Sequence, residues 1–248
     1  MILEVLYPEL GTLFGDAFHV KYLMRCAKDA QLIETHLGEK PAFLSADQKP
    51  DLVYRGSLTE SAQVRMIREL KKEAPAIADR IRAGQRFLIT GNAIEVFGQR
   101  ISDDPDQLLY PGASPEQDAL GLLPFVTKRK MLERQASLYL GKYKDIDVIG
   151  YKATFSTLFA EKPMNPWIRT TKGPGMGPDL PDEGFRLNNF FATTLLGPLL
   201  IINPNLCLDF LADFLPQETF ALPYPQEAMN AYRIKLQTML DPKTVYQF

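Results

Sequence analysis

The segment Arg86-Phe-Leu-Ile-Thr-Gly-Asn-Ala-Ile-Glu-Val-Phe-Gly98 decides how this chain is interpreted. Phe87 to Thr90 are apolar or β-branched, which predicts a buried strand, and Gly91 interrupts the run. Residues 92–97 then predict a short helix that ends at Gly98. A sharp turn from strand to helix is where α/β enzymes present a nucleophile. Glycine occupies the corner here, so the corner offers no side chain.

Strands and helices alternate through the first hundred residues. Apolar runs predict strands over residues 2–7, 32–37 and 52–54, and periodic apolar positions predict helices over 18–30 and 60–82, the second interrupted near Pro75. Strands joined by helices of this length indicate a three-layer α/β/α domain with a mostly parallel sheet. Ligands of such sheets bind at the carboxyl ends of the strands. The loops at 11–16, 56–60 and 91–93 should therefore share one edge.

The second half of the sequence is less regular. Residues 101–121 are rich in Asp, Pro and Gly and predict an exposed excursion, and the Gly- and Pro-rich residues 170–184 predict a mobile loop. Strands are expected over 146–154 and 185–195, and helices over 206–215 and 226–240. We expect one α/β domain over residues 1–215 and a C-terminal helical extension over 216–248 that packs on it.

Composition excludes several functional classes. The chain has 248 residues, 46% of them hydrophobic, and a formal net charge of −2, so it has no general attraction to nucleic acid or anionic membranes. It shows no signal-peptide pattern, no apolar run long enough to span a bilayer and no metal or P-loop motif. These observations predict a cytoplasmic protein with no cofactor, no metal ligands and no nucleic-acid partner.

Six short motifs occur in the order found in a known family. Residues 6–10 (Leu-Tyr-Pro-Glu-Leu) and 14–16 (Phe-Gly-Asp) resemble its opening pattern of Tyr-Pro followed by Tyr-Gly-Asp. Residues 55–60 with Gln63 resemble a glycine loop that helps to form an oxyanion hole. Three later stretches resemble landmarks of the same family: Gly121-Leu-Leu-Pro-Phe125, Ile149-Gly-Tyr151 and the strand end Phe190-Phe-Ala-Thr-Thr-Leu-Leu-Gly-Pro198.

The chain therefore resembles class I glutamine amidotransferase domains of the cobyric acid synthase type, over roughly residues 2–215. Within that group it is most similar to the small glutaminase subunit that acts with a Mur-ligase-like protein in the amidation of lipid II. The resemblance implies an ATP-dependent, ligase-like synthetase as a partner, in cell wall or cobalamin biosynthesis.

The catalytic positions of that family are substituted. The family elbow reads Cys-Gly-Gly-x-Gln-x-x-Gly, and alignment on Gly98 places Gly91 at the cysteine. The same alignment places Asn92 and Ala93 at the two glycines and Glu95 at the glutamine.

The family's histidine stretch is altered in the same way. It reads Gly-Thr-Tyr-x-His-Gly, and alignment on Gly197 places Thr194 at the tyrosine and Leu196 at the histidine. Hydrolysis of glutamine needs a thiolate and a base that carries its proton, and neither Gly91 nor Leu196 supplies one. We therefore predict a glutamine amidotransferase homologue without glutaminase activity, with no catalytic residues. The candidate binding surface consists of Gly56, Ser57, Gly91, Asn92, Ala93, Glu95, Thr194 and Leu196.

Three functions remain open at this point. The chain is a ligand-binding or partner-regulating subunit, or a working amidotransferase subunit that supplies ammonia to a synthetase, or a different hydrolase that uses Ser57 as a new nucleophile. Cys26 and Cys207 are expected to be buried structural thiols. His19 and His36 have no acid–base partner in the sequence, and each is expected to be an ordinary structural or surface residue.

Overall fold

A six-stranded sheet forms the centre of the molecule, which is described by a computed structural model over residues 1–107 and 115–247. Five strands are parallel, and the edge strand β12 runs antiparallel to β13. The order across the sheet is β12 (Phe185–Leu187), β13 (Phe190–Thr193), β4 (Phe87–Thr90), β3 (Leu52–Arg55), β1 (Ile2–Leu6) and β2 (Gln31–Thr35). The predicted mostly parallel sheet is confirmed.

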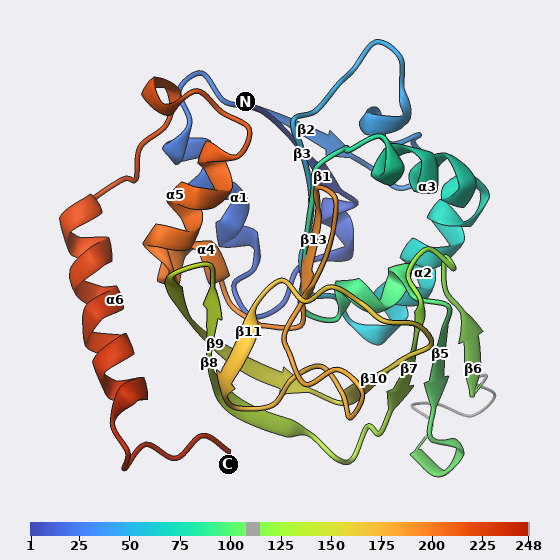
Figure 1. The fold of residues 1–248 in the computed structure, drawn as a ribbon. Helices are drawn as coiled ribbons and strands as arrows, with labels where there is room; N and C mark the ends of the chain where they lie inside the picture. Colours follow the sequence, from blue (N-terminus) through green and yellow to red (C-terminus); the bar gives the residue numbers. More distant parts are fainter. Residues whose placement is uncertain (108–114, 248) are drawn as a thin grey trace.

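Helices cover both faces of this sheet (Figure 1). One face carries α2 (Glu60–Leu70) and α3 (Ala74–Arg82), and the other carries α1 (Ala17–Cys26), α4 (Leu199–Ile202) and α5 (Pro204–Ala212). The alternation of side chains along β4 shows why. Phe87 and Ile89 belong to the apolar core under α2 and α3, whereas Leu88 belongs to the core under α1 and α5. The α/β/α architecture is confirmed.

Local chemistry sets the ends of the helices on the first face. Thr59 caps α2, because its side-chain oxygen accepts a hydrogen bond of 3.2 Å from the backbone amide of Ala62. The long helix predicted over 60–82 is broken by a 3₁₀ turn at Lys71–Glu73, just before Pro75. The other 3₁₀ segments are η1 (Pro8–Leu10), η2 (Ala42–Leu44), η4 (Gly91–Phe97), η5 (Pro105–Gln107) and η6 (Gln217–Thr219).

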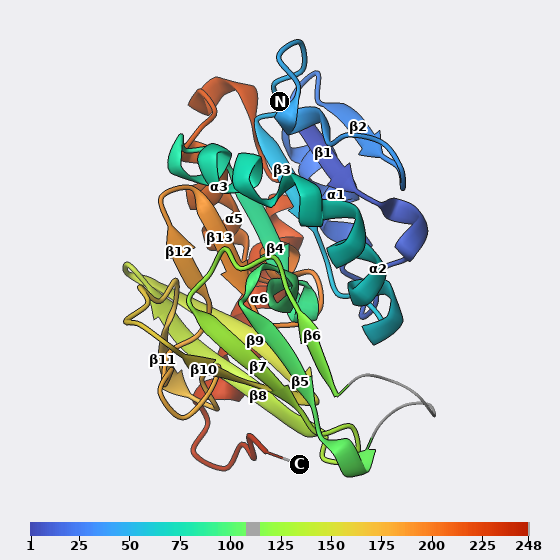
Figure 2. The ribbon, with the colours of Figure 1, turned by 90° about the vertical axis from the view of Figure 1, so that its right-hand side faces the viewer.

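Two further sheets lie beyond the carboxyl ends of the parallel strands, and Figure 2 shows them gathered at that end of the molecule. One has the order β10 (Ser156–Ala160), β7 (Phe125–Arg129), β5 (Arg100–Asp103) and β6 (Glu116–Asp118). The other has the order β11 (Arg169–Lys172), β8 (Gln135–Tyr143) and β9 (Ile146–Thr154). Together they form a lid of mainly antiparallel strands over the place where a ligand of the parallel sheet would lie.

Two sequence-based expectations are wrong in this region. Residues 101–121 are not simply an exposed excursion, because β5 and β6 pair there and Ile101 and Leu120 are buried in the core; part of the stretch, 108–114, lies outside the described residues. The single strand expected over 185–195 is a hairpin of β12 and β13. Its turn contains Asn188 in the left-handed region, at φ 53°.

The last long helix, α6 (Pro225–Leu240), packs against β9, α4 and α5. Its Tyr232 hydroxyl donates a hydrogen bond of 2.6 Å to the carbonyl of Asp147. The division of the chain at residue 215 stays a prediction. In the part of the chain that the structure describes, no helix is long and apolar enough to cross a membrane.

Candidate functional site

The bend after β4 retains the backbone shape of a nucleophile elbow. Gly91 has a positive φ of 61°, which glycine adopts without a Cβ clash. A Cβ placed on Gly91 would lie 2.9 Å from Ser57 Cβ, 3.1 Å from Leu196 Cδ2, and closer still to Ser57 Oγ. The Ser57 hydroxyl therefore fills the space in which a side chain at position 91 would lie.

Asp16 holds this hydroxyl in place. Its Oδ2 accepts hydrogen bonds from Ser57 Oγ (2.7 Å), Ser57 N (2.8 Å) and Thr90 Oγ1 (2.9 Å), and the residue is fully buried. Gly56 permits this approach, because a Cβ there would lie 2.7 Å from Asp16 Cβ. Three loops thus meet at one edge of the sheet, as the sequence predicted. The sequence did not indicate that Asp16 is the centre of the contact.

Tyr54 and His19 extend the network beneath the bend. The Tyr54 hydroxyl donates to the Asp16 carbonyl (2.8 Å) and lies 3.1 Å from His19 Nδ1. His19 Nε2 accepts from the Leu200 amide (3.2 Å), which places the proton of the neutral ring on Nδ1. Complete burial lowers the pKa of His19, so the ring is held in its neutral form.

None of the cysteines or histidines of the sequence faces the bend. His19 lies beneath it, and His36 is exposed beside Glu9, at 3.4 Å. Cys26 and Cys207 are buried in the helical layer. A hydrogen bond with Cys26, together with burial, raises the pKa of the Cys207 thiol, so this thiol is unreactive at neutral pH. No cysteine–histidine pair is assembled over Gly91.

Arg55 fixes the loop between β1 and α1. Its guanidinium is buried and donates to the carbonyls of Leu6 (2.8 Å), Tyr7 (2.8 Å) and Gly11. Burial lowers the pKa of Arg55 to about 10, so the side chain stays charged at neutral pH. The amide of Leu13 also donates to the Ser57 carbonyl, at 3.1 Å. The loop is therefore attached to the sheet at several points.

A cavity of about 140 Å³ lies above the bend, between the central sheet and the lid. Of the eight predicted residues, Asn92, Glu95, Thr194 and Leu196 line it. Gly56, Ser57, Gly91 and Ala93 are not among its lining residues and are buried. The rest of the wall was not predicted as part of the site from the sequence, and it consists of Leu13, Phe14, Leu58, Glu60, Arg134, Ala153, Thr154, Phe155, Ser156 and Leu158.

The two amides that face the bend from the glycine loop are already engaged. Ser57 N donates to Asp16, as described, and Leu58 N donates to Asn92 Oδ1 (2.8 Å). Asn92 Nδ2 returns a hydrogen bond of 2.8 Å to the Leu58 carbonyl, so its side chain pairs with backbone and does not cap the helix. An oxyanion needs free donors at this place. These two donors are satisfied internally.

Glu95 belongs to a buried ionic cluster. Its Oε2 accepts from Arg129 Nε (3.1 Å) and Gln63 Nε2 (3.2 Å), and the two charged side chains are 2% and 5% exposed. Arg129 also donates to Gln63 Oε1 (2.5 Å). Glu95 lines the cavity, whereas Arg129 and Gln63 lie behind it. The negative end of this cluster therefore faces the cavity.

A second buried ion pair holds the opposite wall. Glu183 accepts from the Thr194 amide (2.7 Å) and hydroxyl, and pairs with Lys152 Nζ at 2.9 Å. Lys152 also donates to the Gly175 carbonyl (2.5 Å). The segment 170–184, which was expected to be a mobile loop, thus begins in β11 and is tied to β9 and β13. The Thr194 hydroxyl is thus committed to Glu183.

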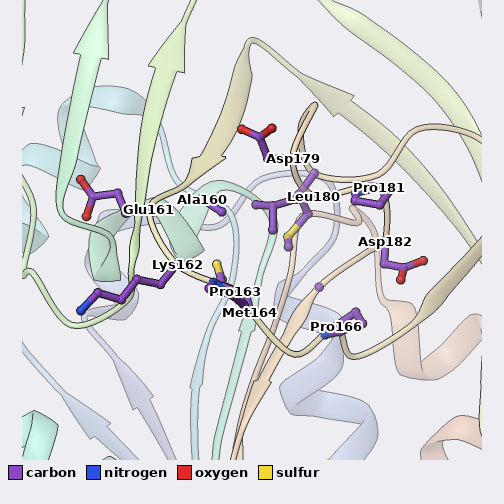
Figure 3. Close-up of a pocket in the computed structure, with 12 residues that line it drawn as sticks. Ala160, Glu161, Lys162, Pro163, Met164, Pro166, Asp179, Leu180, Pro181 and Asp182 are labelled. Atoms are coloured by element: carbon purple, nitrogen blue, oxygen red, sulfur yellow. The ribbon is translucent and has the colours of Figure 1, made fainter.

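A larger and more open cavity, of about 500 Å³, lies between the end of β10 and residues 176–184 (Figure 3). Met176 and Leu180 are buried at its base, and Glu161, Lys162, Asp179 and Asp182 are charged residues of its lining. Residues 1–107 and 115–247 contain no group of three His, Cys, Asp or Glu side chains that could hold a metal ion.

Comparison with known proteins supports the fold. No family model and no curated protein matches the sequence. The structure of PurLQS from Thermotoga maritima matches with a TM-score of 0.49 and 13% identity, over 95% of this chain and 98% of that chain. A glutamine amidotransferase from the same organism matches with a TM-score of 0.49 and 11% identity, over 95% and 91%. A further glutamine amidotransferase structure matches with a TM-score of 0.50 and 14% identity, over 84% of this chain and 97% of that chain.

The molecule thus has a class I glutamine amidotransferase-like fold, as the sequence motifs implied. At these identities the likeness concerns the fold alone. The finer resemblance, to the cobyric acid synthase type and to the lipid II-amidating subunit, stays a prediction.

Proposed function

We propose that this protein is a glutamine amidotransferase homologue without glutaminase activity, which acts as a ligand-binding or partner-regulating subunit. The observation that carries the proposal is the position of the Ser57 hydroxyl, which occupies the side-chain space at Gly91. Leu196, at the position of the family histidine, covers the same point with a methyl group.

Two physical arguments support the absence of glutaminase chemistry. Removal of one member of a nucleophile–base pair costs several orders of magnitude in rate, and both members are absent here. The amides of Ser57 and Leu58 are also bonded to Asp16 and Asn92, so they offer no stabilisation to a developing oxyanion. The scaffold and a cavity persist, and both suit binding.

The alternative is a working amidotransferase subunit that supplies ammonia to an ATP-dependent, ligase-like synthetase. It rests on the family resemblance. A hydrolase that uses Ser57 receives no support from the geometry, because Ser57 is 1% exposed and does not line the cavity. A Mur-ligase-like partner, the pathway and a cytoplasmic location remain proposals drawn from the sequence.

An ammonia-release assay tests the proposal. The purified chain is incubated with glutamine, alone and with any ligase-like protein that co-purifies with it, and ammonia is measured. We expect no release above the uncatalysed background in either case. Release that a substitution at Gly91 or Asn92 abolishes would contradict the proposal and favour the working subunit. Labelling by an electrophilic probe that Ser57→Ala removes would favour the hydrolase.

A further inference from the structure

We propose that the cavity above the Gly91 bend binds a small primary alkylammonium ligand, with its ammonium group at Glu95 and its alkyl stem on Leu58 and Leu196. The inference rests on the proposed ligand-binding function and names the ligand class of that site.

Glu95, the buried charged side chain of the cavity wall, is a hydrogen-bond acceptor. The Asn92 side chain hydrogen-bonds to the Leu58 backbone, and the Thr194 hydroxyl hydrogen-bonds to Glu183. Glu95 has a carboxylate that accepts only, and Oε2 alone takes the bonds from Arg129 and Gln63. The Glu95 carboxylate therefore favours a ligand that donates hydrogen bonds.

Charge favours a cation over an anion. Glu95 is 2% exposed and faces the cavity, and its partner Arg129 lies on the far side of the carboxylate. Glu60, which is half-buried, adds a second carboxylate to the wall. Arg134 is the cation of the lining, and it is exposed, with its guanidinium 6.0 Å from the Phe155 ring. An anion in the interior would face carboxylates in a medium of low dielectric constant.

The apolar residues of the cavity favour an alkyl stem for the ligand, and the cavity volume limits the length of that stem. Leu58 and Leu196 are buried apolar residues of its lining, and Leu196 stands at the position that aligns with the family histidine. Burial of an alkyl stem against them is favourable by the hydrophobic effect. A volume of about 140 Å³ has room for about five water-sized groups, at about 30 Å³ each, which matches a four-carbon stem with one ammonium group.

A matched series of three ligands tests the inference by isothermal titration calorimetry. Butylammonium, butanamide and butanoate each have a four-carbon chain and differ in its terminal group. We expect butylammonium to bind at least tenfold more tightly than butanamide, and butanoate to show no binding. Equal binding of butanamide, or preferential binding of butanoate, would overturn the inference, as would failure of all three ligands to bind.

Variants connect the binding to named residues. Glu95→Gln should weaken the binding of butylammonium at least tenfold and change the affinity for butanamide by no more than about threefold. Glu133→Gln is the control and should leave both affinities unchanged, because Glu133 is exposed outside the cavity. Glu95→Gln removes a partner of Arg129, so Leu196→Phe, which fills the cavity, serves as a second variant and should abolish binding. Unchanged affinity in both variants would overturn the inference. The ammonia assay is independent, so glutaminase activity would contradict the proposed function whatever the calorimetry shows.

Discussion

The hydroxyl of Ser57 and the α-carbon of Gly91 belong to different loops, yet the hydroxyl occupies the side-chain position of the glycine. Ser57 Cβ lies 2.9 Å from the ideal position of a Cβ on Gly91, so the two residues compete for one space. A substitution that adds a side chain at one position must displace the other. This relationship explains how the bend persists without its usual occupant.

We predict that Gly91→Ala lowers the free energy of unfolding by about 2–4 kcal/mol. The positive φ of 61° costs a residue with a Cβ about 1 kcal/mol, and the clash with Ser57 adds about 1–3 kcal/mol. Gly38→Ala is the matched control, since Gly38 has φ 87° with no atom within 4 Å of its Cβ, and should show the conformational cost alone. Urea unfolding measures both variants.

The same competition makes a double variant informative. Ser57→Gly combined with Gly91→Ala should cost less than the sum of the two single substitutions, because the first removes the atoms that the second meets. Strictly additive costs would show that the two residues do not share the space.

Loss of Asp16 should disconnect the three loops at the bend. We predict that Asp16→Ala destabilises the protein by about 3–4 kcal/mol, because the buried donors of Ser57 and Thr90 lose their acceptor. Asp179→Ala, at an exposed site, should change stability by less than about 0.5 kcal/mol. Equal effects of the two variants in urea unfolding would contradict the central role of Asp16.

His19 should make the protein less stable as the pH falls. Burial lowers its folded pKa below 6.5, so the unfolded chain binds the proton first. Stability is therefore lost as the pH falls from 6.5 towards the folded pKa, with a slope of up to about 1.4 kcal/mol per pH unit. Asp16 and Tyr54 are the titratable residues that hydrogen-bond to the ring.

The slope can be isolated by comparison of variants. Urea unfolding between pH 7.5 and 5 should lose this slope in His19→Gln and keep it in His36→Gln, since His36 is exposed. If the free energy of unfolding of His19→Gln still falls with pH at this slope, groups other than His19 cause the pH dependence.

The ion pair of Lys152 and Glu183 should be costly to break. We predict that Glu183→Gln lowers the free energy of unfolding by about 3–5 kcal/mol, because it leaves a buried ammonium without its counter-charge. Glu133→Gln breaks the exposed pair with Lys130, which has a similar distance of 3.0 Å, and should cost less than about 0.5 kcal/mol. If thermal unfolding shows that Glu183→Gln and Glu133→Gln lose similar amounts of stability, burial of the ion pair does not determine the cost of breaking it.

The sequence predicts the parallel half of the fold well, because its signals are local. The apolar run of β4, the glycine at the bend and the interruption near Pro75 each follow from neighbouring residues. Most strands of the lid were not predicted from the sequence. Strand β7 (Phe125–Arg129) contains a buried arginine and pairs with β5 and β10, which are distant in the sequence, so its stability comes from these partners.

The same difference applies to the site. Asn92, Glu95, Thr194 and Leu196, which line the cavity, were predicted by alignment on Gly98 and Gly197 with the family motifs that the sequence resembles. Arg134 and residues 153–156 were not predicted, since the lid brings them there, and Glu60 at the start of α2 was not named among the site residues either. Asp16 appeared in the sequence only as part of a motif. Its role depends on Gly56, whose missing side chain allows the two loops to touch, and no pattern in either loop alone reveals that contact.

The guanidinium of Arg55 has a thermodynamic consequence for any molecule that enters the cavity. It binds three carbonyls at the end of β1 and in the loop that carries Leu13 and Phe14, so this part of the wall is held rigidly against the sheet. Little backbone entropy then remains to be lost on association. Calorimetry should accordingly show a small entropic penalty, and an Arg55→Lys protein, with fewer donors to hold the loop, should show a larger one.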